Sequence, residues 1–92
     1  TYNFIYFMNK IEVNKFNFLE FEPHVINEVN ESDRYFDAYL INRNTKRELI
    51  AEIKINLKDD KKSKLTIKKK NGLVHPKALL AMNSFMSTYK DD

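Results

Sequence analysis

The sequence contains no cysteine, only one glycine and only two prolines among its 92 residues. The absence of cysteine excludes disulfides, thiolate metal ligands and cysteine nucleophiles, and it is typical of a reducing compartment. A single glycine excludes the loops that cradle the phosphates of bound nucleotides, because those loops need several glycines for close backbone approach. We therefore expect no nucleotide cofactor and no thiol chemistry.

Long hydrophobic runs are also missing. The longest apolar runs span a few residues, whereas a membrane-crossing helix needs about 20. No signal-peptide pattern opens the sequence. We expect a cytoplasmic protein with no membrane contact and no small-molecule substrate.

Residues suited to catalysis or metal binding are few and poorly placed. His24 and His75 each stand beside a proline and form no spaced ligand pair, so we expect no metal site. Asp59 and Asp60 are adjacent carboxylates, but they lie among lysines and not in the apolar pocket that an acid catalyst requires. These features predict that the protein is not an enzyme.

The composition is that of one small folded domain, residues 1–92. The chain is 42% hydrophobic and has seven Phe and five Tyr, which suffices for a packed core. A chain this short buries only about 60% of its unfolded surface, so a homodimer would add useful core. Lysine, asparagine and isoleucine outnumber arginine and alanine, a bias typical of low-GC bacteria and their phages.

The net charge of +3 hides a strong asymmetry. Residues 1–40 carry three basic and seven acidic side chains, whereas residues 41–90 carry thirteen basic and four acidic ones. Such a distribution indicates either a surface for a polyanion or two charged regions that neutralise each other after folding. The sequence leaves both possibilities open.

Alternation of apolar and polar residues predicts a strand at 49–57. A period of two places one set of side chains on the buried face of a sheet. That set is Leu49, Ala51, Ile53, Ile55 and Leu57. The opposite set would lie in water and would give the sheet one continuous cationic plane.

Residues 35–41 predict a second strand that pairs with residues 49–57 through a hairpin. A four-residue loop at 44–47 places Asp37 opposite Lys54, whereas a two-residue loop at 44 and 45 places Asp37 opposite Glu52. Like charges directly opposite each other are unfavourable. The longer loop is therefore the preferred prediction.

The remaining elements complete an α+β fold. Residues 64–70 continue the alternation after a polar turn, two strands are expected at residues 2–8 and 14–23, and the spacing of apolar residues at 76–89 predicts an amphipathic helix with Pro76 in its first turn. We expect an antiparallel sheet of four or five strands, a hairpin plus a three-stranded meander, covered on one face by the C-terminal helix.

The lysines of the meander suggest a contact with nucleic acid, single-stranded or directed at the backbone. Ammonium groups pair with phosphates, and exposed aromatic rings on the same face stack on bases. The candidate residues are Tyr35, Tyr39, Arg43, Lys54, Lys61, Lys62, Lys64, Lys68 and Lys70. Two alternatives stay open: the lysines protect an edge strand from association, or they bind an acidic protein surface.

A separate set of apolar residues suggests a protein partner. Ile41 and Ile50 have the parity of the face turned away from the C-terminal helix, and Leu80 lies on the polar arc of that helix. The first two are covered by the N-terminal strands, or they form an interface with a partner or a second copy. The alternative function is therefore a protein-interaction module, such as a phage or mobile-element inhibitor or adaptor.

Overall fold

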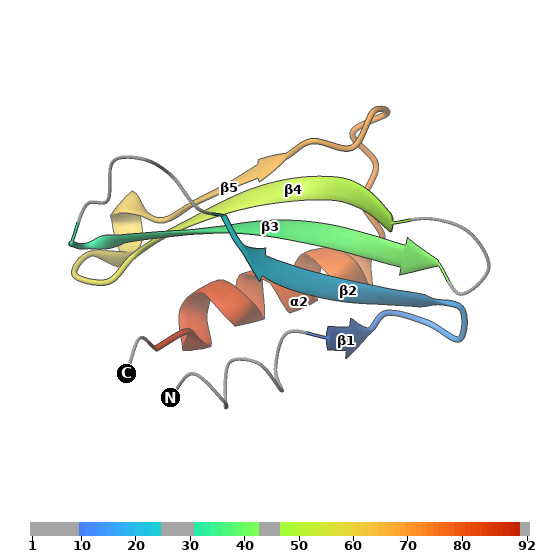
Figure 1. Ribbon diagram of the computed structural model, residues 1–92, viewed down its shortest axis with the longest axis horizontal. Coiled ribbons are helices and arrows are strands. Elements are labelled where there is room, and N and C mark those ends of the chain that lie inside the picture. Colours follow the sequence, from blue (N-terminus) through green and yellow to red (C-terminus); the bar gives the residue numbers. More distant parts are fainter. Residues whose placement is uncertain (1–9, 25–30, 43–46, 91–92) are drawn as a thin grey trace.

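The computed structural model describes residues 10–24, 31–42 and 47–90. These residues form a five-stranded antiparallel sheet in the order β1-β2-β3-β4-β5, followed by one helix (Figure 1). The elements are β1 (Lys10–Glu12), β2 (Asn17–Pro23), β3 (Asp33–Asn42), β4 (Arg47–Asn56), the 3₁₀ helix η1 (Asp60–Lys62), β5 (Lys64–Ile67) and α2 (Pro76–Thr88). The predicted α+β class, the antiparallel sheet and the C-terminal helix are confirmed.

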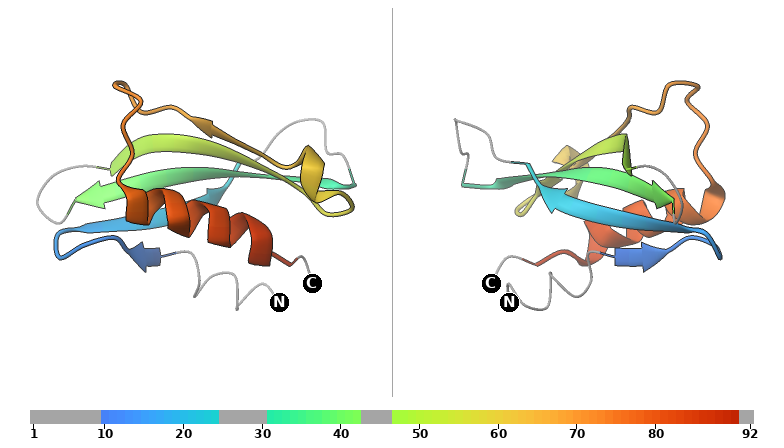
Figure 2. Two further views of the ribbon diagram at one scale, coloured as in Figure 1. Left: turned by 180° about the vertical axis from the view of Figure 1, so that it is seen from behind. Right: turned by 45° about the vertical axis from the view of Figure 1, so that its right-hand side comes forward.

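The core lies between α2 and one face of the sheet (Figure 2). Phe85 of α2 stacks on Phe21 of β2, with ring centroids 4.2 Å apart, and meets Phe36 of β3 edge to face at 5.0 Å. Met82 and Ala78, about one and two turns earlier on the helix, are buried beside it. The i, i+4, i+7 spacing of Ala78, Met82 and Phe85 places all three on one stripe, which explains why α2 docks along its length.

The start of the helix matches the sequence prediction. Pro76 occupies the first turn, where its missing N–H breaks no hydrogen bond. His75 is the N-cap, and its Nδ1 accepts a hydrogen bond from the backbone N–H of Lys77 at 3.1 Å. Within residues 10–24, 31–42 and 47–90, no helix has the length and apolar character needed to cross a membrane.

The pairing of β3 with β4 corrects the predicted register. Asp37 lies opposite Glu52, not opposite Lys54, and a β-bulge follows at Ile50, so that Ala38 faces Ala51 but Tyr39 faces Leu49. The like-charged pair is tolerated because each carboxylate has its own basic partner, described below. The predicted loop lies mostly outside the described residues, as does Arg43.

The bulge also corrects the predicted faces of β4. Because one extra residue shifts the alternation, Ile50 turns into the core and is only 1% exposed, while Leu49 takes its place on the opposite face. The carbonyl of Ile50 accepts a hydrogen bond from the backbone N–H of Lys68 at 2.7 Å, which fixes the bulge against the β5 side of the sheet. The prediction that Ile50 lies on the face turned away from the C-terminal helix is therefore wrong. Leu57 follows the end of β4 and is exposed.

The N-terminal part of the sheet is partly as predicted. The expected strand before Pro23 is present as β2. The three-residue strand β1 is too short to show a period and was not expected; its Ile11 pairs with Leu19. The other expected N-terminal strand, at residues 2–8, lies outside the described residues.

Candidate nucleic-acid interface

The face of the sheet opposite α2, hereafter the outer face, is not covered by any other part of the described chain (Figures 1 and 2). Pairing across the strands arranges its side chains in four rows. Row 1 is His24, Tyr35, Lys54 and Lys64; row 2 is Glu22, Asp37, Glu52 and Thr66; row 3 is Glu20, Tyr39 and Leu49; row 4 is Phe18, Ile41 and Arg47.

Row 1 places two lysines directly opposite each other. Lys54 of β4 is paired with Lys64 of β5, and Tyr35 of β3 lies on the other side of Lys54. The Lys54 Nζ is 4.0 Å from a carboxylate oxygen of Asp33, the limit of an ion pair, while Lys64 is exposed and has no ion-pair partner among the described residues. Row 1 thus joins one aromatic ring and two ammonium groups on three adjacent strands.

Row 2 places three carboxylates side by side on β2, β3 and β4, and each contacts a different basic group. His24 Nδ1 lies 2.9 Å from Asp37 Oδ2, and this contact raises the pKa of His24. Lys68 Nζ lies 3.5 Å from Glu52 Oε1. Glu22 pairs with Arg47. The three partners explain how Asp37 and Glu52 can face each other despite their like charges.

Arg47 connects row 4 to rows 2 and 3. Its guanidinium lies 3.7 Å from the ring centroid of Tyr39 and 3.4 Å from Glu20, in addition to its ion pair with Glu22. The hydrogen bond from Arg47 holds the pKa of Glu22 below its ordinary value, and the same contact raises the pKa of Arg47. The Arg47 guanidinium therefore already contacts the ring of Tyr39, whereas Tyr35 lies in row 1 beside Lys54.

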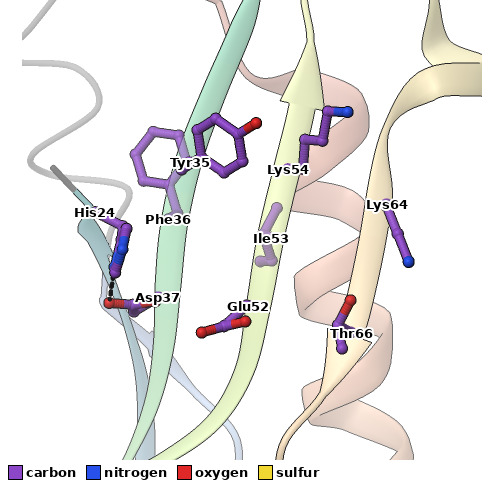
Figure 3. Close-up of a pocket in the computed structure, with 9 residues that line it drawn as sticks. All are labelled: His24, Tyr35, Phe36, Asp37, Glu52, Ile53, Lys54, Lys64 and Thr66. Atoms are coloured by element: carbon purple, nitrogen blue, oxygen red, sulfur yellow. Dashed lines mark hydrogen bonds and ion pairs between the residues drawn. The ribbon is translucent and has the colours of Figure 1, made fainter. Parts of the chain in front are cut away.

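A shallow depression of about 310 Å³ lies over rows 1 and 2 (Figure 3). Tyr35, Lys54 and Lys64 line one end, and Asp37, Glu52 and Thr66 line the other, with His24 at the margin. Figure 3 shows the Glu52 carboxylate extending from β4 toward β3, beside Asp37. The depression combines a ring, two cations and a row of hydrogen-bond acceptors.

The turn between β4 and β5 carries further lysines and is held by Asn56. Its side-chain oxygen accepts from the backbone N–H groups of Lys58 and Asp59, and its amide donates to Asp33 at 2.8 Å. Asn56 is 8% exposed, so these bonds are sheltered from water. The turn is therefore ordered, and it presents Lys61 and Lys62 from η1 as exposed side chains.

The predicted site residues are only partly brought together. Tyr35, Lys54 and Lys64 line the depression, Lys61 and Lys62 lie in η1, and Lys68 follows β5 and pairs with Glu52. Lys70 is exposed in a turn beyond β5. The expected continuous cationic plane is wrong, because the carboxylates of row 2 separate the lysines of row 1 from Lys68.

The predicted protein-contact residues are scattered. Ile41 is half-buried in row 4, Ile50 is in the core, and Leu80 is 71% exposed on α2. They share no single surface, since α2 and row 4 lie on opposite faces of the sheet. The apolar residue that this part of β4 contributes to the outer face is Leu49 and not the predicted Ile50.

Among the residues that line the depression, sequence reasoning named only Tyr35, Lys54 and Lys64 as site residues; it gave no role there to Asp37, Glu52, Thr66 or His24. It also did not predict that His24 pairs with Asp37. The contact with His24 depends on the register of β2 against β3, which brings Glu22 opposite Asp37 and His24 next to Tyr35. No local pattern encodes this long-range pairing, although the parity of Thr66 with Lys64 and Lys68 was available.

Comparisons with protein-family models, curated proteins and solved structures found no match for this chain. Among the side chains that the structure describes, no group of three or more His, Cys, Asp and Glu residues is placed to hold a metal ion. What the geometry defines is a small sheet-and-helix protein with one open, charged face.

Proposed function

We propose that this protein binds single-stranded nucleic acid on the outer face of its sheet, through the β3, β4 and β5 side of rows 1 and 2. The observation that carries the proposal is row 1, where Tyr35, Lys54 and Lys64 lie in register on three neighbouring strands. The protein acts by binding and not by catalysis. Lys61 and Lys62 of η1 add two exposed ammonium groups beyond the end of β4.

The cross-strand pair of lysines supports an anionic ligand. Two like charges placed directly opposite each other destabilise a sheet, and here Lys64 is exposed and Lys54 is half-buried. A phosphate group between Lys54 and Lys64 turns this repulsion into two attractive contacts. Affinity would then fall with salt, because each neutralised phosphate releases condensed counterions.

Tyr35 supports a single-stranded ligand over a duplex. Its ring is half-buried beside Lys54 at the edge of the depression. A base that has no pairing partner can stack on such a ring, and one stacked base contributes about 1 to 3 kcal/mol in known complexes. In a duplex the bases are stacked on each other and the ring has nothing to contact.

Fluorescence anisotropy of a labelled single strand of about ten nucleotides, titrated over a salt series, tests the proposal. The test variant is the double substitution Lys54→Gln and Lys64→Gln. Its matched control is Lys77→Gln with Lys90→Gln, which removes the same charge from exposed positions at the two ends of α2. We expect the test variant to lose about tenfold or more in affinity and about 1.4 in the slope of log K against log salt, two phosphates at about 0.7 each.

Equal losses in the two double variants would show that only net charge matters and would overturn the assignment of the site to row 1. An absence of binding by the wild-type protein at low salt would overturn the function itself. A tighter complex with a duplex of the same length would contradict the role given to Tyr35, which Tyr35→Ala tests separately.

A second function is favoured by exposed leucines on α2 and in the segment before it. Leu80 on α2 and Leu73 before it are 71% and 70% exposed, and Leu79 is 40% exposed. These leucines are a candidate contact for a protein partner. Capture of one stoichiometric protein that survives nuclease and high salt, and that Leu80→Ser abolishes, would support this function; retention by the Leu80→Ser variant would exclude it.

A further inference from the structure

We infer that row 2 recognises the base of the bound strand, and that Glu52 selects a base whose edge donates hydrogen bonds, guanine above all. This inference rests on the proposed function. In protein–nucleic acid complexes phosphate contacts position the ligand, while contacts to base edges provide specificity. Row 1 is placed to contact phosphates, and row 2 is placed to contact the edge of a base.

The geometry places Glu52 within reach of a base stacked on Tyr35. Tyr35 is directly opposite Lys54, so Glu52, two residues earlier on β4, is its diagonal neighbour at about 7 Å between backbone positions. Both residues line the same depression, and the Glu52 carboxylate extends toward β3 (Figure 3). A ring lying on Tyr35 would therefore point its outer edge along row 2.

Of the three carboxylates in row 2, Glu52 is the one available as an acceptor. Asp37 is engaged by His24 at 2.9 Å, and Glu22 is paired with Arg47 outside the depression. Glu52 has only a 3.5 Å contact with Lys68, and both of these side chains are close to half-exposed. An incoming donor needs to displace only a weak, solvated ion pair.

The chemistry of an ionised carboxylate then determines the preference. It accepts hydrogen bonds and donates none. Guanine presents two adjacent donors, N1–H and the N2 amino group, which match the two carboxylate oxygens. Cytosine and adenine offer one amino group each, and thymine or uracil flanks its single N3–H with two carbonyl oxygens that repel the carboxylate. The expected order is guanine first, then cytosine and adenine, then thymine.

The experiment compares a strand of about ten thymidines with strands in which one central position is guanosine, inosine, cytidine or adenosine. The proteins are wild type, Glu52→Gln and the control Glu48→Gln, which removes the same charge from an exposed position on the same strand, opposite Leu40. In wild type we expect guanosine to be favoured over thymidine by about 5- to 10-fold, the low end for a bidentate base contact. Inosine, which lacks the N2 amino group, should lose most of this preference.

Glu52→Gln should raise general affinity more than Glu48→Gln, because it removes a negative charge from the binding face and releases Lys68 from its ion pair. Only Glu52→Gln should bring the guanosine preference close to one. A preference that survives in Glu52→Gln, or one that inosine retains in full, overturns the role of Glu52. Binding of all strands with equal affinity overturns base recognition and leaves the proposed function intact. Failure of the wild type to bind any strand removes both.

Discussion

The two faces of the sheet are built by different rules. The core face is mostly apolar, and four ring pairs among Phe21, Phe36, Phe85 and Tyr89 have centroids 4.2 to 5.8 Å apart. The outer face alternates a cationic row with an acidic one, and its polar groups form ion pairs across strands. Burial of apolar side chains therefore determines the fold, while the register between strands determines which charged side chains meet on the outer face.

The bulge at Ile50 changes which residues of β4 lie on each face of the sheet. It allows the consecutive residues Ile50 and Ala51 to be buried together, and it turns Leu49 and Arg47 to the outer face. A regular strand would have buried Leu49 and exposed Ile50. The contact of Arg47 with Tyr39 and Glu22 thus depends on one irregular residue in the core.

The largest effect is expected from the core face. Phe85→Ala removes a ring that contacts Phe21, Phe36 and Tyr89, and we expect it to lower the free energy of unfolding by about 3 to 5 kcal/mol. Leu80→Ala, on the exposed arc of the same helix, should change it by less than about 0.5 kcal/mol. Urea unfolding measures both. Similar losses in the two variants would contradict the docking of α2.

A smaller effect tests the bulge. Ile50→Ala should cost about 2 to 4 kcal/mol, because the side chain is fully buried, whereas Leu49→Ala on the half-exposed outer face should cost about 1 kcal/mol. Urea unfolding of the two variants at one temperature checks the order. A larger loss for Leu49→Ala would indicate regular alternation in β4 and would restore the predicted faces.

The smallest effect concerns His24 and Asp37 on the outer face. Because Asp37 raises the pKa of His24 in the folded protein, protonated His24 stabilises the fold below about pH 6.5, and this contribution is lost as the pH rises through the raised pKa. Replacing His24 by Gln should therefore lower Tm by about 2 °C at pH 5.5 and by less at pH 8.5, since an exposed pair contributes little. An equal change at both values would show that the ion pair is not the cause.

Most of the core face could be predicted from the sequence. The alternation in β3 and β4 and the helical period of α2 are local patterns, and the predicted burial of Ala51, Ile53 and Ile55 is confirmed. The exceptions are Ile50, which is buried, and Leu49 and Leu57, which were predicted on the buried face and lie outside the core. A bulge is an irregularity that alternation cannot reveal, and β-branched Ile50 has the same local preference on either face of a strand.

The outer face was much less predictable. Charge repulsion alone favoured placing Asp37 opposite Lys54, but the structure satisfies Asp37 and Glu52 with partners from other elements. Those partners are His24, at the end of β2, and Lys68, after β5. Pairwise arguments about two strands could not include a third and a fourth strand, so the acidic row was missed.

The most direct test of the central claim is a titration of the isotope-labelled protein with a single strand of about ten nucleotides, followed by amide chemical shifts. If the outer face is the binding face, the largest changes will fall on Tyr35, Glu52, Lys54, Lys64 and Thr66, and the amides of Leu79, Leu80 and Asn83 on α2 will stay in place. Changes concentrated on α2, or no changes at low salt, would contradict the account.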